Sequence, residues 1–162
     1  VMLSEETASG DHPVGALSYM ARIVTSAEET FSHDRYLGMT PGSGVSESVA
    51  HAACVLADHL GAAAVVAPTS SGRTAAHVSR FRPRQPVIAV SPNETTVRRS
   101  TLYWGCEPVF TGPPDPDEDV VELAVRTALA EGRVNSGDLL VVTAGHPFWV
   151  PGSTNMIRVR PA

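Results

Sequence analysis

AAAVVAPTSSGRT, residues 62–74, is the stretch that decides the fold. Its first part, residues 62–68, is a short apolar run of the length of a buried β-strand. Hydroxyl-bearing residues, one glycine and one arginine follow the run, and the spacing then predicts a helix up to about Phe81. The segment therefore predicts a strand that delivers a polar loop to the start of a helix.

The same strand-and-helix alternation continues along the chain. Further strands are predicted at residues 87–90, 107–111, 139–144 and 156–159. Apolar spacing predicts helices at 13–31 and 45–60, and the start signals at 91–94 and 115–118 predict two more. Short strands that alternate with helices indicate an α/β fold with a mostly parallel five-stranded sheet covered on both faces.

Length and composition restrict the class of protein. The 162 residues, 43% of them hydrophobic, are enough for one ordinary core. No apolar run approaches the ~20 residues of a membrane-spanning helix, so no membrane partner is expected. Residues 1–3 resemble the end of a strand, which suggests a piece of a longer protein. Cys54 and Cys106 lie in apolar surroundings, so we expect free thiols and a cytoplasmic location.

The charge is strongly polarised along the chain. All twelve basic residues are arginines, and the net charge is -5. Six arginines and a single acid, Glu94, fall within residues 73–99, so this segment carries +5 and the remainder -10. Such a chain can hold an anion locally, but its overall acidity argues against nucleic-acid binding.

The loop after residue 68 is the strongest candidate site. A helix start presents unpaired amides with partial positive charge, so a phosphate can accept hydrogen bonds from the amides and from nearby hydroxyls together. The candidate phosphate-binding residues are Thr69, Ser70, Ser71, Gly72, Arg73 and Thr74. An ordinary helix cap that binds nothing is the alternative interpretation.

A second loop, residues 145–154, follows the strand predicted at 139–144 and reaches the same edge of the sheet. It is either a flap over a ligand or a rigid turn that packs its aromatic residues. The arginines at 80, 82 and 84 either contact a ligand or pair with nearby acids. His51 and Cys54 share a helical face, but no further ligands are spaced to complete a metal site, so we expect core packing.

Some catalytic groups are missing from the sequence. Phosphoryl transfer relies on metal-held phosphates and cationic groups, usually including a lysine, and this chain has no lysine. No carboxylates converge at the predicted strand ends to hold magnesium. The sequence therefore predicts neither phosphoryl transfer nor a metal site within this segment.

Two groups of motifs follow each other along the chain. The first comprises residues 1–8, 10–14 and 20–23, and the second comprises residues 69–75, with SRFRP at 79–83, IAV at 88–90 and LYWG at 102–105. The first group resembles the last strand and helix of the catalytic barrel of the pyruvate kinase family, and the second group resembles the C-terminal domain of that family. The resemblance divides the chain into a remnant of the last β/α unit of a (β/α)₈ barrel at 1–32, a linker at 33–44 and the C-terminal α/β domain at 45–162.

The resemblance implies a three-layer α/β/α domain whose last strand is antiparallel. Family members transfer phosphate from phosphoenolpyruvate to ADP in glycolysis, usually as homotetramers, with magnesium and often potassium. A complete barrel takes about 250 residues, so the catalytic machinery is expected outside this chain and the segment alone is expected to be inactive, with no cofactor of its own. Ser4 and Glu6 match positions at the barrel's last strand, where Ser4 is at most an outlying member of a proton relay.

The resemblance also implies that the loop at 69–74 holds a phosphate of an allosteric effector. A second effector loop would close over it, with residues His146, Val150, Pro151, Gly152 and Ser153. In the animal form of the family, the effector's other phosphate is bound near the position that matches Val120, and this chain has no tryptophan or arginine near that position. AMP or a sugar monophosphate is therefore favoured over fructose 1,6-bisphosphate. Two other functions remain open: a phosphosugar-binding isomerase-like domain, for which His77 is the only nearby candidate, and a purely structural assembly module.

Overall fold

The computed structural model describes residues 1–115, 118–147 and 152–162. The chain divides into two compact units, Val1–Ser32 and His33–Ala162. The first unit holds α1 (Glu5–Ala8) and α2 (Pro13–Glu28), which contact each other. Residues 1–3 form no strand here and are largely exposed, so the strand expected there is not present in the structure. A lone strand has no hydrogen-bonding partner in this unit, which accounts for the difference.

The second unit contains the sheet. Its helices are α3 (His33–Leu37), α4 (Val45–Leu60), α5 (Arg73–Arg80), α6 (Glu94–Ser100) and α7 (Val120–Ala130). Its strands are β1 (Ala64–Pro68), β2 (Val87–Ser91), β3 (Cys106–Phe110), β4 (Leu139–Gly145) and β5 (Thr154–Pro161). The expected linker at 33–44 thus includes one short helix.

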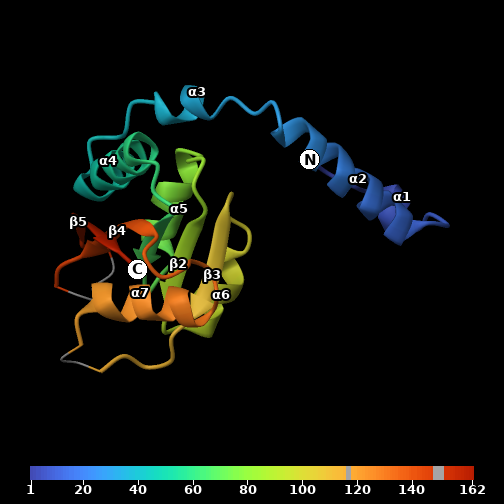
Figure 1. Cartoon of the computed structure of the whole chain (residues 1–162). Coiled ribbons are helices and arrows are strands. Elements are labelled where there is room, and N and C mark those ends of the chain that lie inside the picture. The colour runs from blue at the N-terminus through green and yellow to red at the C-terminus, as the bar shows by residue number, and fades with distance from the viewer. Residues whose placement is uncertain (116–117, 148–151) are drawn as a thin grey trace. The chain divides into compact units, whose positions relative to one another are not determined.

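The strand order is β3-β2-β1-β4-β5 (Figure 1). The first four strands are parallel neighbours, and β5 pairs antiparallel with β4, with a register shift between Ala144 and Gly145. This confirms the mostly parallel five-stranded sheet and the antiparallel last strand. The carboxyl ends of β1 and β4 are adjacent, so the loops that follow them meet.

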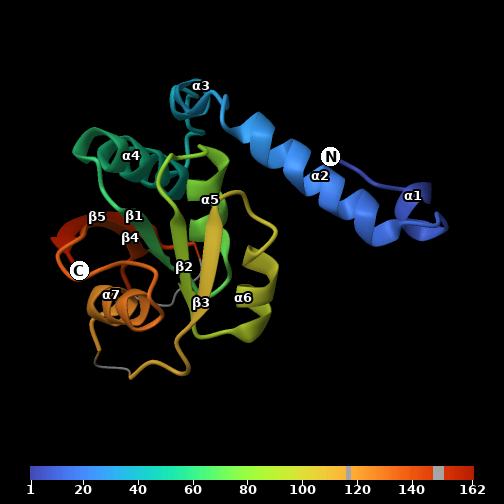
Figure 2. The same ribbon diagram turned by 45° about the vertical axis from the view of Figure 1, so that its right-hand side comes forward.

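Side chains alternate between two cores, one on each face of the sheet. Ala64 and Val66 of β1 pack with α7, whereas Val65 and Ala67 pack with α4 and α5. This period of two is what a strand buried on both faces requires. Figure 2 shows α7 on one side of the sheet and α4 and α5 on the other, which is the expected three-layer arrangement.

Two helices begin later than the start signals predicted. Ser91 remains in the sheet opposite Phe110, and its Oγ accepts from the Asn93 amide at 3.2 Å, so α6 starts only after Asn93. The N-cap of α7 is Asp119 rather than Asp115, because the Asp119 carboxylate accepts from the Val121 amide at 2.7 Å. Pairing within the sheet therefore overrides the local capping preference at Ser91.

Candidate functional site

The candidate site starts where β1 ends. The Thr69 amide donates to the Val90 carbonyl at 2.9 Å, which extends the ladder between β1 and β2 by one bond. The chain then turns at Gly72, whose φ of 82° suits glycine and not an L-residue. The Gly72 amide donates to Thr69 Oγ1 at 3.0 Å and closes the turn. The polar loop is thus a short, defined turn into α5.

The amides of the first turn of α5, after Gly72, remain available. Thr69 Oγ1 accepts from the Gly72 amide, and no other side chain caps this helix start in the part of the chain that the structure describes. The first amides of a helix have no partner within the helix and carry partial positive charge, so this end attracts an anion.

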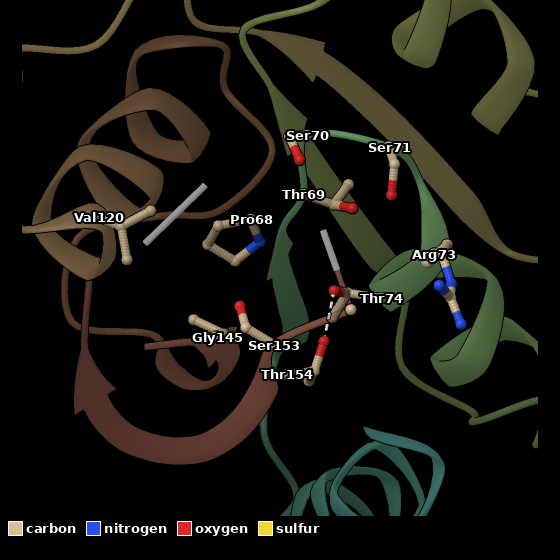
Figure 3. A pocket seen from close by; sticks show the side chains of 12 residues that line it. Pro68, Thr69, Ser70, Ser71, Arg73, Thr74, Val120, Gly145, Ser153 and Thr154 are labelled. Carbon is tan, nitrogen blue, oxygen red and sulfur yellow. Dashed lines mark hydrogen bonds between the residues drawn. The ribbon is translucent and has the colours of Figure 1, made fainter. Parts of the chain in front are cut away.

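A small hollow opens beside the loop (Figure 3). Its volume is about 20 Å³, a little more than one water molecule needs, so it admits the end of one small group rather than a whole metabolite. The expected site residues that line it are Thr69, Ser70, Ser71, Arg73, Thr74, Gly152 and Ser153. The structure thus brings together residues of the two loops that the sequence singled out.

The other expected site residues have different places. Gly72 forms the turn without lining the hollow, and His146 is also absent from the described lining. The His146 backbone is instead tied to Asn155, through its amide at 2.9 Å and its carbonyl at 2.7 Å. Val150 and Pro151 lie outside the described residues. The flap that would include them therefore stays a prediction.

Thr154 is a member of the site that the sequence analysis did not select. Its hydroxyl lies 2.8 Å from that of Thr74, and both side chains are buried. Since one hydroxyl of the pair donates to the other, the accepting hydroxyl keeps its own proton for a further partner. In the sequence Thr154 is the last residue of the second loop, two positions before the predicted strand, and its hydroxyl group was the only signal.

Hydroxyl groups surround the hollow on both sides. Figure 3 shows Thr69, Ser70 and Ser71 on one side, and Ser153 and Thr154 on the other. Thr69 Oγ1 accepts from Gly72 and still has a proton to donate. Nothing acidic is found among the described residues that line the hollow, and Arg73 supplies a positive charge. The arrangement suits one negatively charged oxygen group.

Most other arginines of the basic segment have structural partners. Arg80 pairs with Glu47, and Arg84 pairs with Asp34 at 2.6 Å and Asp58 at 3.4 Å. The Arg82 guanidinium lies 4.3 Å from the centre of the Trp104 ring. None of these three arginines is among the described residues that line the hollow. This favours a structural role for them over contact with a ligand.

His51 and Cys54 are packing residues. His51 Nε2 lies 2.7 Å from the Leu37 carbonyl oxygen, and its ring packs against Phe81 with the centroids 4.7 Å apart. Both cysteines are free thiols, and burial raises the pKa of Cys54 and of Cys106 to about 12. Within the ranges that the structure describes, no three His, Cys, Asp or Glu side chains are grouped so that they could hold a metal ion.

Ser4 and Glu6 lie in the first unit and interact with each other. The Ser4 hydroxyl donates to the Glu6 carboxylate at 3.3 Å, and the Ser4 amide donates to it at 3.2 Å. Hydrogen bonds from the backbone amides of Glu6 and Ser4 lower the pKa of the Glu6 carboxyl group. The membership of Ser4 in a proton relay stays a prediction.

Across the described residues, every helix is too short or too polar to cross a membrane. The fold and the site define a three-layer α/β domain that gathers polar loops at the carboxyl ends of parallel strands, where such folds bind ligands. Comparison with family models matches residues 47–160 to the pyruvate kinase alpha/beta domain. The chain belongs to this family.

Curated relatives agree with the family assignment. Pyruvate kinase of Clostridium acetobutylicum is 37% identical over 163 residues, which are 99% of this chain and 34% of that protein. The pyruvate kinases of Staphylococcus haemolyticus and Geobacillus stearothermophilus are 39% and 38% identical over 98% of this chain and 28% of their own length. The chain thus spans about a third of the length of the curated relatives it matches.

Proposed function

We propose that this chain is the regulatory and assembly domain of a pyruvate kinase and that it binds a phosphorylated effector in the loop at 69–74. The full enzyme would transfer phosphate from phosphoenolpyruvate to ADP in the cytoplasm. Magnesium and potassium would be bound in the full enzyme by residues outside this chain. The family match supports the first part, and the free thiols are compatible with a reducing compartment.

The observation that carries the effector proposal is the first turn of α5, whose amides remain available, next to a hollow lined by hydroxyls. A phosphate group there would accept from the first amides of α5 and from the Ser70 and Ser71 hydroxyls, beside the Arg73 guanidinium. This combination of donors is stronger for a charged oxygen than for a neutral ligand, because hydrogen bonds to an ionised acceptor are about twice as strong as neutral ones.

A monophosphate suits the site better than a bisphosphate. The other helix that reaches the hollow is α7, through Val120, and its start is already capped by the Asp119 carboxylate. A second phosphate at that helix start would meet this negative charge. AMP or a sugar monophosphate is therefore the proposed class of effector, in preference to fructose 1,6-bisphosphate.

Isothermal titration of the 162-residue chain tests the proposal. AMP and glucose 6-phosphate should bind, and fructose 1,6-bisphosphate should bind no more tightly than they do. Ser71→Ala should weaken AMP binding several-fold, because it removes one donor to a charged acceptor. Ser136→Ala is the matched control, since Ser136 is an exposed serine just before β4, at the opposite edge of the sheet.

Two results would favour the other functions. Absence of heat with every phosphate compound would leave the domain as a purely structural assembly module. Turnover of a sugar phosphate by the isolated chain would support the isomerase-like alternative, which the family match does not favour. His77 is a poor candidate for its base, because it is absent from the described lining of the hollow.

We also propose that the chain self-associates, as a homotetramer in the full enzyme. An apolar groove on α4 and β5 supports this, lined by His51, Ala52, Val55, Leu56, His59 and Ile157. Val55 is 42% exposed there, although it is apolar. Sedimentation velocity should show an oligomer that Val55→Arg dissociates, and a monomeric wild-type chain at high concentration would count against assembly through this domain.

A further inference from the structure

The loop at residues 69–72 has a second side, opposite the hollow. Its carbonyl groups on that side receive hydrogen bonds from α6 and from Asn93, the residue that precedes it. Asn93 Nδ2 donates to the Ser70 carbonyl at 2.8 Å, and Thr96 Oγ1 donates to the same oxygen at 2.9 Å. The Arg99 guanidinium donates to the Ser71 carbonyl. None of these three donors is among the described residues that line the hollow.

The direction of the carbonyls determines the direction of the amides. In a trans peptide the C=O and the following N–H point to opposite sides. Holding the carbonyls of Ser70 and Ser71 toward α6 therefore turns the amides of Ser71 and Gly72 away from α6. The Gly72 amide meets Thr69 Oγ1 on that side, as this geometry requires.

Asn93 does not cap its own helix. It occupies the N-cap position of α6, where an asparagine side chain ordinarily accepts from the helix amides, yet no side-chain cap is formed there. Its amide group donates to the loop instead. A residue that gives up a favourable local interaction for a contact with a polar loop is typical of a functional constraint rather than of packing alone.

Gly72 adds a second link between the loop and α6. A Cβ atom at this position would lie 3.4 Å from Ser100 Oγ and 3.5 Å from the Arg99 guanidinium and Thr96 Cγ2. The loop backbone at Gly72 thus packs directly against the side chains of α6.

We infer that Asn93, Thr96 and Arg99 are positioning residues that preset the loop for an anion by fixing the orientation of its peptide groups. Arg99 also brings a positive charge to the loop from behind, without entering the hollow. This inference rests on the proposed function, because it assigns to these residues a role in the same phosphate site.

Three substitutions with matched controls test it in the 162-residue chain. Asn93→Ser keeps a good N-cap residue but is too short to reach Ser70. Thr96→Val removes only the hydroxyl, and Thr96→Ser restores it. Arg99→Gln and Arg98→Gln make the same charge change at neighbouring positions, but Arg98 pairs with Glu94 at 3.2 Å and not with the loop.

The readouts are AMP and inorganic phosphate affinity by titration, and amide hydrogen exchange of residues 70–75 without ligand. We expect Asn93→Ser, Thr96→Val and Arg99→Gln each to weaken AMP binding about 3- to 10-fold, the usual range for one lost hydrogen bond. Exchange in the loop should become faster, with the urea midpoint of the whole chain nearly unchanged. Thr96→Ser and Arg98→Gln should behave like the wild-type chain.

Two failures are distinguishable. If Ser71→Ala weakens AMP binding but Asn93→Ser, Thr96→Val and Arg99→Gln do not, the phosphate site stands and the positioning role is wrong. If the wild-type chain binds neither AMP nor inorganic phosphate, the proposed function fails and this inference fails with it.

Discussion

The hydroxyl oxygens of Thr74 and Thr154 lie 2.8 Å apart, although the two residues are 80 positions apart in sequence. This hydrogen bond joins the first turn of α5 to the first residue of β5, so it fixes the two loops against each other. It is buried on both sides, with Thr74 only 7% and Thr154 only 4% exposed. The pair is therefore a structural element of the site as well as a source of one free hydroxyl proton.

Thr74→Val should destabilise the chain by about 1–3 kcal/mol, because it leaves the buried Thr154 hydroxyl without a partner. Removing both hydroxyls in a Thr74→Val/Thr154→Val chain should cost less than the sum of the single changes. Urea unfolding measures all three values. Thr74→Ser is the control and should stay near the wild-type free energy of unfolding, and strict additivity would contradict the coupling.

Gly72→Ala should lower the free energy of unfolding by about 1–2 kcal/mol, since an L-residue is strained in the left-handed conformation that Gly72 adopts. The added Cβ would make only ordinary van der Waals contacts with α6, at 3.4 to 3.5 Å, so the cost comes from the backbone. Gly44→Ala is the comparison, because Gly44 has a φ of -78° and open space around it. Thermal unfolding of both variants distinguishes backbone strain from a general effect of adding a methyl group.

The Cys54 thiol should resist alkylation in the folded chain. Burial raises its pKa to about 12, and the thiolate is the reactive form, so at pH 8 only about one molecule in 10⁴ carries it. Iodoacetamide labelling followed by mass spectrometry should show slow modification that becomes complete in urea. Rapid labelling of the native chain would mean that Cys54 is not held in the core.

The same thiol makes stability depend on pH in the alkaline range. Because the folded pKa lies above the unfolded value, the folded state keeps its proton longer, and the stabilisation is complete below pH 9. The free energy of unfolding should fall between pH 9 and about pH 12, and Cys54→Ala should remove that part of the slope.

Asp119→Ala should cost about 1 kcal/mol, because it removes the N-cap of α7. Asp119→Asn keeps an acceptor for the Val121 amide and loses only the exposed ion pair with Arg158, which contributes little. Burial by itself raises the pKa of Asp119, but the Val121 amide and the Arg158 guanidinium outweigh it and hold the pKa below 3.8. This stabilisation is present above pH 3.8 and should be lost as the pH falls below that value.

The sequence predicted the sheet, the helices that cover it and the loop that follows β1. These features depend on local periodicity and on turn residues, which a single sequence displays. It did not predict the partner of Thr74, since that contact depends on the register between β4 and β5 and on the shift at Gly145. It also missed the role of Asn93, because the hydrogen bond from its side chain to the Ser70 carbonyl joins residues that are far apart in sequence.

The late start of α6 has a similar origin. Ser91 offers good capping chemistry, but the hydrogen bonds of the sheet hold it in β2. Long-range pairing of this kind is invisible in a window of a few residues. From β1 onward, the errors therefore fall at element boundaries and leave the order of elements unaffected.

The antiparallel direction of β5 determines which of its residues lies at the hollow. The other four strands end at the edge of the sheet where the hollow lies, but β5 begins at that edge. Thr154 therefore follows β4 without another helical crossover. A parallel fifth strand would begin at the far edge and could not present its first residue to Thr74. One change of direction thus gives the pocket an extra wall with very little additional chain.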